Sequence, residues 1–301
     1  MKTPSNKTLF AARVAKGWFS QESAAEGVSD AGKVALSDSG YEVSVRTYRR
    51  WESAAPGWPR PDQATALRAA FGRGPEHLGE ARVYYSEALN TATISGDYPL
   101  ATRTLSNMAR QSVDVDKPRE AVRFARTAQQ YAAKWDAPPR VAALLAIRAA
   151  QAYARGGDEM NVSHSIKRAW RSFDQGTDHG DPDWVGFLNE AELVCLEGMC
   201  WSDLGQHKRA IRLLDRSASL QDIEHSRNRG MCLAQLARAA VHHRDLDRTA
   251  DAAKESLRLI EGGQPSARTR RQLLNVRESL HPHQSSAQAR ETIDLLTAHV
   301  A

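Results

Sequence analysis

Apolar residues recur along this chain of 301 residues at steps of three and four, and no convincing run alternates apolar and polar residues. A step of three or four is the spacing of amphipathic helices, whereas half-buried strands need a period of two. Alanine, the strongest helix former, is abundant. Most prolines stand just before or within the first turn of a plausible helix, where their missing N–H costs nothing. The pattern predicts an all-α fold.

The organisation of the chain changes near residue 78. Before it, short helices are separated by Gly, Ser and Pro; beyond it, the helices lengthen and come in pairs. This change predicts an N-terminal helical domain over 1–78 and a helical-repeat domain over 79–301. The short helices are expected at about 6–16, 20–28, 44–54 and 61–71, with a turn-rich break over 54–61.

Internal similarity marks the larger part. Equivalent positions recur at intervals of 39 to 48 residues, at Ala121, Val162, Ala210, Ala250 and Ala289. The clearest unit runs from Gly198 to Leu214 and resembles a tetratricopeptide (TPR) repeat. Its small, aromatic and large residues follow the order of that repeat, at Gly198, Trp201, Gly205, Ala210 and Leu214. An irregular helical bundle with coincidental spacing is the alternative. The Gly198–Leu214 unit favours a TPR-like α-solenoid.

The segment Val43–Ser53 carries the most specific signal of the chain. Ser44 is a good N-cap for the helix that follows it. Helical spacing divides the segment into an inner face of Val45, Tyr48, Trp51 and Glu52 and an outer face of Arg46, Arg49, Arg50 and Ser53. Arginine pairs bidentately with guanine edges and with phosphate, so the outer face suits an anionic partner. A solvated basic surface is the alternative interpretation.

Residues 7–79 resemble the lambda-repressor-like helix-turn-helix regulators of the xenobiotic-response-element (XRE) family. The likeness lies in Ser20-Gln21, which opens the second helix after the segment from Arg13 to Phe19, and in the order Ser44, Thr47, Tyr48, Arg50, Trp51 and Glu52. The resemblance implies a set of DNA-binding residues: Gln21, Ser44, Arg46, Thr47, Arg49 and Arg50. It assigns base edges to Arg46 and Arg49, phosphates to Thr47 and Arg50, and a structural ion pair to Arg13 and Glu52.

The spacing departs from the family pattern in two places. Gly17 to Ser20 contains one residue more than the commonest arrangement, and the stretch from Ser29 to Val43 is much longer than a short turn. Two interpretations remain open for the long stretch. Either the second helix continues to about Leu36, or an inserted loop containing Lys33 and residues 37–40 projects toward DNA or a partner.

A TPR array lines a concave groove with the first helix of each pair. The repeat phase places Asn107, Arg110, Arg148 and Gln151 among the groove positions. Arginine and amide side chains of this kind suit the backbone and carboxylate of an extended peptide. The alternative is that they are ordinary polar residues of the surface.

The sequence offers no support for catalysis, a cofactor or a metal. Ten histidines and three cysteines include no His-Glu-x-x-His and no Cys-x-x-Cys, and no Gly-x-Ser-x-Gly or glycine-rich phosphate loop occurs. The odd cysteine count favours reduced thiols, the longest apolar run (141–147) is too short for a membrane, and no signal peptide opens the chain. We therefore expect a cytoplasmic protein that is not an enzyme, with no membrane partner.

The whole architecture resembles bacterial regulators in which a repeat domain dimerises and senses a signal. The expected function is that of a sequence-specific transcriptional regulator, a homodimer bound to a palindromic operator in double-stranded DNA, responding to a peptide or a small molecule. A net charge of +5 permits this partner without establishing it. The alternative is a TPR-type scaffold for protein–protein interaction with an N-terminal docking module.

Overall fold

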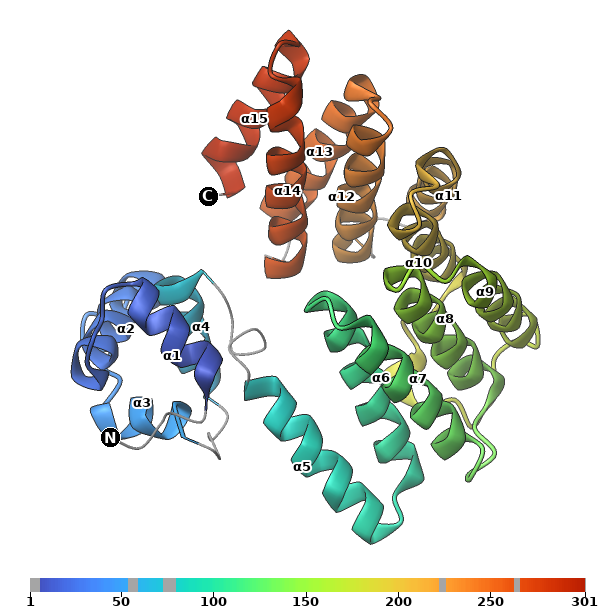
Figure 1. The fold of residues 1–301 in the computed structure, drawn as a ribbon, viewed down its shortest axis with the longest axis horizontal. Helices are drawn as coiled ribbons and strands as arrows, with labels where there is room; N and C mark the ends of the chain where they lie inside the picture. Colours follow the sequence, from blue (N-terminus) through green and yellow to red (C-terminus); the bar gives the residue numbers. More distant parts are fainter. Residues whose placement is uncertain (1–5, 54–58, 73–79, 222–225, 263–265, 301) are drawn as a thin grey trace. The chain divides into compact units, whose positions relative to one another are not determined.

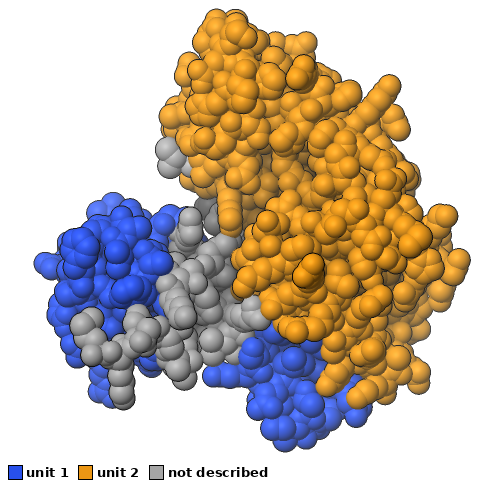
Figure 2. Space-filling view, in the orientation of Figure 1, with its two compact units in different colours: residues 1–108 blue, residues 109–301 orange. Residues whose placement is uncertain are grey.

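The computed structural model describes residues 6–53, 59–72, 80–221, 226–262 and 266–300. These residues form fifteen α-helices and contain no strand, which confirms the all-α prediction. The chain divides into two compact units, residues 1–108 and 109–301 (Figure 2). The domain boundary expected between 78 and 79 and most of the expected break over 54–61 lie outside the described residues. No helix within the described ranges is long and apolar enough to cross a membrane.

The first unit begins with four helices around one apolar core. They are α1 (Lys7–Ala15), α2 (Gln21–Leu36), α3 (Val45–Trp51) and α4 (Pro61–Phe71). The core is made by fully buried side chains from all four, including Leu9, Val28, Tyr48, Trp51 and Leu67. Helix α2 packs against both α3 and α4. Asn6, Ser20 and Ser44 cap the first three helices through their side chains.

Of the two interpretations of the stretch before α3, the continuous helix is confirmed, because α2 runs to Leu36 and ends at Ser37 in the left-handed conformation (φ 52°). The chain then folds back onto α2. The backbone N–H of Val43 donates to the hydroxyl of Ser29 at 2.8 Å, and Tyr41 lies against Gly32. A Cβ atom on Gly32 would lie 2.4 Å from the Tyr41 ring, so this close packing requires glycine.

Longer helices follow, most of them in pairs. Three precede the pairs: α5 (Glu80–Ser95), α6 (Tyr98–Asp114) and α7 (Pro118–Ala132). The pairs are α8 (Pro139–Arg155) with α9 (Glu159–Phe173), α10 (Glu190–Asp203) with α11 (His207–Leu220), α12 (Ser226–His242) with α13 (Leu246–Glu261), and α14 (Ala267–Leu280) with α15 (Ala287–Val300). Within the second unit, α7 packs on α8, α8 on α10, and α12 on α14, so successive pairs stack in register (Figure 1).

The repeat positions expected from the sequence share one environment. All five are at most 1% exposed, and each lies near the start of the second helix of a repeat, in α7, α9, α11, α13 and α15. The five residues are Ala121, Val162, Ala210, Ala250 and Ala289. Gly198 on α10 packs against Leu214 on α11, where a Cβ would lie 2.9 Å from the leucine Cγ. Small residues thus let the two helices of a pair approach closely.

Candidate functional site

Helix α3 is short and is held by its inner face. Tyr48 and Trp51 are fully buried, with their rings edge to face and 5.9 Å apart. The guanidiniums of Arg46, Arg49 and Arg50 are exposed on the other side. The predicted division of the two faces is therefore confirmed. The helix ends earlier than expected, at Trp51 instead of 54, and its C-cap residue, Glu52, is buried.

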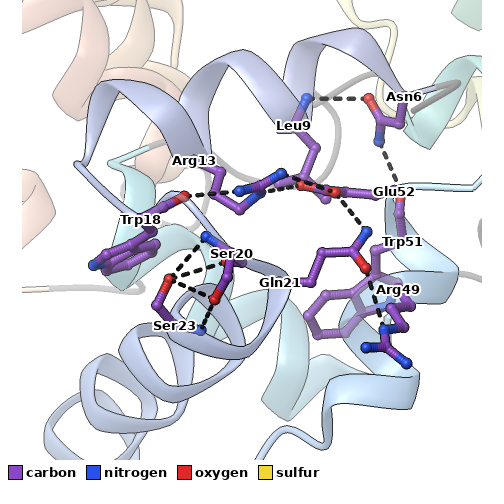
Figure 3. A network of polar contacts seen from close by, with 10 residues as sticks. All are labelled: Asn6, Leu9, Arg13, Trp18, Ser20, Gln21, Ser23, Arg49, Trp51 and Glu52. Carbon is purple, nitrogen blue, oxygen red and sulfur yellow. Dashed lines mark hydrogen bonds and ion pairs between the residues drawn. The ribbon is translucent and has the colours of Figure 1, made fainter. Parts of the chain in front are cut away.

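An ion pair ties the end of α3 to α1 (Figure 3). Arg13 Nε donates to Glu52 Oε1 at 2.6 Å, and both side chains are more than nine-tenths buried. Arg13 Nη1 also donates to the carbonyl oxygen of Trp18 at 2.8 Å. The ion pair implied by the family resemblance is confirmed. A second link was not predicted: Asn6 Nδ2 donates to the carbonyl oxygen of Trp51 at 3.0 Å.

The same carboxylate begins a chain of contacts that reaches the exposed face of α3 (Figure 3). Gln21 Nε2 donates to Glu52 Oε2 at 2.8 Å, and Gln21 Oε1 accepts from Arg49 Nε at 3.2 Å. Arg49 Nη2 pairs with Glu22 Oε1 at 2.5 Å. Both ends of the Gln21 amide are thus used inside the unit, where the amide orients Arg49 from a carboxylate that is itself held by Arg13.

Charge is distributed unevenly along the exposed face. A hydrogen bond from the backbone, followed by the Arg49 guanidinium, lowers the pKa of Glu22, so Glu22 stays ionised and offsets Arg49. The guanidiniums of Arg46 and Arg50 make no hydrogen bond or ion pair with any residue that the structure describes. Ser44 and Thr47 serve the N-cap: the Thr47 N–H donates to Ser44 Oγ at 3.2 Å, and their hydroxyls lie 2.9 Å apart.

The predicted groove residues are not ordinary surface residues. Arg148 and Gln151, on α8, are 7% and 5% exposed, and Arg148 Nη1 donates to Gln151 Oε1 at 2.7 Å. Asn107 and Arg110 are half-buried on α6. Burial, and next the positive charge of Arg110, lower the pKa of Arg148 to about 9.

Two further charged residues act on the pKa of Arg148 and were missed from the sequence. Arg268, at the start of α14, also lowers the pKa of Arg148, whereas the carboxyl of Glu192 on α10 acts in the opposite direction. Arg268 Nη2 lies 3.4 Å from Asp114 Oδ1, at the end of α6. The sequence shows Arg268 only as a charged residue near the start of the first helix of a pair. Its partner Asp114 is 154 positions away, so no local pattern joins the two.

The described cysteines are buried, and two of the described histidines stack on each other. Cys195, Cys200 and Cys232 are buried, and burial raises the pKa of the Cys200 thiol well above its usual range. The rings of His207 and His242 stack 5.2 Å apart. Within the described ranges, no three His, Cys, Asp or Glu side chains gather in a group able to hold a metal ion.

No model of a known protein family matches the sequence, and no curated protein matches it either.

Proposed function

We propose that this chain is a sequence-specific DNA-binding transcriptional regulator. In this proposal α1 to α4 form an XRE-type helix-turn-helix domain, and the paired helices form a TPR-like domain that dimerises and senses a peptide or small molecule. One observation carries the DNA-binding part: α3 is anchored rigidly by Tyr48, Trp51 and Glu52 while its arginines face outward. A rigid helix with an outward arginine stripe suits insertion into the major groove.

The contacts suggest a division of roles on α3. Arg46 is unpaired and reaches base edges directly, whereas Arg49 reaches them in an orientation set by Gln21. Arg50 is unpaired near the end of the helix and contacts phosphate. Thr47 and Ser44 stay close to the backbone of the duplex at the start of the helix. In a symmetric dimer, two such helices read half-sites about one turn of DNA apart.

Binding of the purified full chain to genomic fragments, followed by footprinting, tests the DNA-binding proposal. On the selected site, Arg46→Ala is expected to cost about 1–3 kcal/mol and to relax the preference at one base pair. Arg50→Ala is expected to weaken binding to all sequences and to reduce the salt slope by about one. Arg123→Ala is the matched control, since Arg123 is also exposed but lies on α7 of the repeat unit.

Wild-type affinity in both α3 variants would refute the assignment of α3 as the recognition helix. Retention of a protein partner without any sequence-selective retention of DNA would favour the scaffold alternative. Sedimentation equilibrium of the full chain tests the dimer separately, because a monomer at micromolar concentration contradicts it whatever α3 does.

A further inference from the structure

A pocket of about 450 Å³ opens beside the turn between α10 and α11. It is lined by the start of α11 and by His243, just after α12, and these two helices pack on each other (Figure 1). Its volume lies within the range of small-molecule sites. No described residue of the lining is acidic, and five are basic: His207, Lys208, Arg209, Arg212 and His243.

Two of these cations have no partner among the described residues. Lys208 and Arg212 are exposed, and neither makes a hydrogen bond or an ion pair within the part of the chain that the structure describes. They lie four positions apart on α11, a spacing at which side chains are neighbours and like charges repel each other. Asp215, three positions after Arg212, is paired with Arg248 instead.

Arg209 is oriented by contacts with α10. Its guanidinium lies over the Trp201 ring, 3.5 Å from the centroid, and its Nη2 is 3.8 Å from Glu197 Oε1. The Glu197 carboxylate also accepts from the indole N–H groups of Trp170 and Trp201, at 2.7 and 3.1 Å. This carboxylate balances Arg209, so the excess of positive charge at the pocket comes from the two cations without described partners.

The position of the cations on α11 adds to their repulsion. Lys208 and Arg209 lie in the first turn of this 14-residue helix, which contains no acidic residue and where the helix dipole disfavours positive charge. The N-cap residue, Gln206, makes no capping hydrogen bond with its side chain, and its amide donates to Glu159 Oε1 at 2.7 Å. An anion in the pocket is therefore attracted by the side chains and by the helix alike.

We propose that this pocket binds the phosphoryl group of a small molecule, with Lys208, Arg209 and Arg212 as the contacting cations. A phosphoryl group offers three acceptor oxygens to several cations at once, whereas a carboxylate offers two. Arginine contacts phosphate through its fork and lysine contacts it as a compact point charge. The proposal rests on the sensing role proposed above, which it deepens by naming the chemistry of the small-molecule signal.

NMR of the histidine rings tests the site in the full chain without DNA. Sodium phosphate is titrated against sodium chloride at constant pH and ionic strength, and sodium acetate is titrated in the same way. Phosphate should shift the ring signals of His207 and His243 in a saturable manner, because both residues line the pocket, and acetate should not. The rings of His281 and His299, which do not line it, are the internal control.

Neutral substitutions on α11 measure what each cation contributes. Lys208→Gln and Arg212→Gln should each raise the half-maximal phosphate concentration about tenfold, since each removes one charged hydrogen-bond donor. The double variant should abolish the saturable shift. Arg216→Gln is the matched control and should keep the wild-type titration, because Arg216 is also exposed on α11 but pairs with Glu190 at 2.6 Å and does not line the pocket.

Absence of the saturable shift at His207 and His243, an equal response to acetate, or a wild-type titration of the double variant would overturn the proposal. Duplex DNA also presents phosphates, so the salt dependence of DNA binding, measured by fluorescence anisotropy, separates the two sources. The double variant should keep the wild-type salt slope. A slope lower by about two would assign both cations to the DNA backbone and would likewise overturn the proposal.

The phosphate titration contains no DNA, so its failure leaves the footprinting result intact. Failure of operator binding leaves the histidine titration intact in the same way. The two proposals therefore fail separately.

Discussion

Because Arg13 and Glu52 form a buried ion pair, we expect the conservative substitution Glu52→Gln to cause a large loss of stability. The substitution Glu52→Gln keeps the shape of the side chain but replaces one carboxylate oxygen by an NH2 group, which donates hydrogen bonds and cannot accept them. The carboxylate accepts from Arg13 at 2.6 Å and from Gln21 at 2.8 Å, so the amide can satisfy only one of them. Breaking a buried ion pair costs about 3–5 kcal/mol, and one remaining hydrogen bond returns about 1 kcal/mol. The expected loss of stability around α3 is about 3 kcal/mol.

Amide hydrogen exchange of the full chain measures this loss locally. A loss of about 3 kcal/mol makes opening roughly a hundredfold more frequent, which should appear in α1 and α3 and not in α8 to α15. The matched control is Glu22→Gln, which makes the same substitution in the same unit. Its pair with Arg49 is more than half exposed, so exchange should change little.

A double-variant cycle checks the reason for the effect. Arg13→Met alone should also destabilise α3, because it leaves the Glu52 carboxylate buried without its cation. The double variant Arg13→Met with Glu52→Gln should cost about 2 kcal/mol less than the sum of the two, since no isolated charge remains. Additive losses, or a loss no larger than that of the exposed control, would show that the buried pair does not hold α3 in place.

Three further predictions follow from single contacts. Glu22→Gln should tighten DNA binding at low salt and steepen the salt dependence by about one, measured by fluorescence anisotropy, because a carboxylate no longer competes with phosphate; an unchanged slope contradicts this. Gly32→Ala should cost about 1–3 kcal/mol in urea unfolding, since the new methyl meets the Tyr41 ring. Burial lowers the pKa of both His207 and His242, so the unfolded chain binds protons more readily and the Tm of the repeat unit should fall below about pH 6.5; a flat profile between pH 7.5 and 5 refutes this.

Local sequence patterns were sufficient to place the helices and the inner face of α3. Burial of Tyr48 and Trp51 follows from helical spacing alone, since the positions share one face. The end of α2 was harder to predict, because residues 29–36 mix small, polar and apolar side chains that suit either a helix or a loop. Tyr41 decides the outcome by packing on Gly32 of α2, which is a tertiary contact.

Of the contacts that lead from Arg13 to Arg49, only the ion pair between Arg13 and Glu52 could be predicted from the sequence. The ion pair was expected through a resemblance, but the role of Gln21 depends on which oxygen of Glu52 is still available once Arg13 has bound the other. In the repeat unit, Arg110 and Arg148 were expected to share a groove. Arg268 was missed because its neighbourhood depends on how four stacked helix pairs curve, and no local pattern encodes that curvature.

Three buried arginines of this chain differ in what holds them. Arg13 has a buried carboxylate as its partner, and Arg140 has a carbonyl oxygen and an aromatic ring. Both therefore have what a buried guanidinium needs, and their replacement should cost stability. Arg148 has one amide oxygen and two neighbouring cations. Arg148 has fewer hydrogen-bond partners among the described residues than Arg13, and no aromatic ring beside it as Arg140 has, so its replacement should cost the least stability of the three.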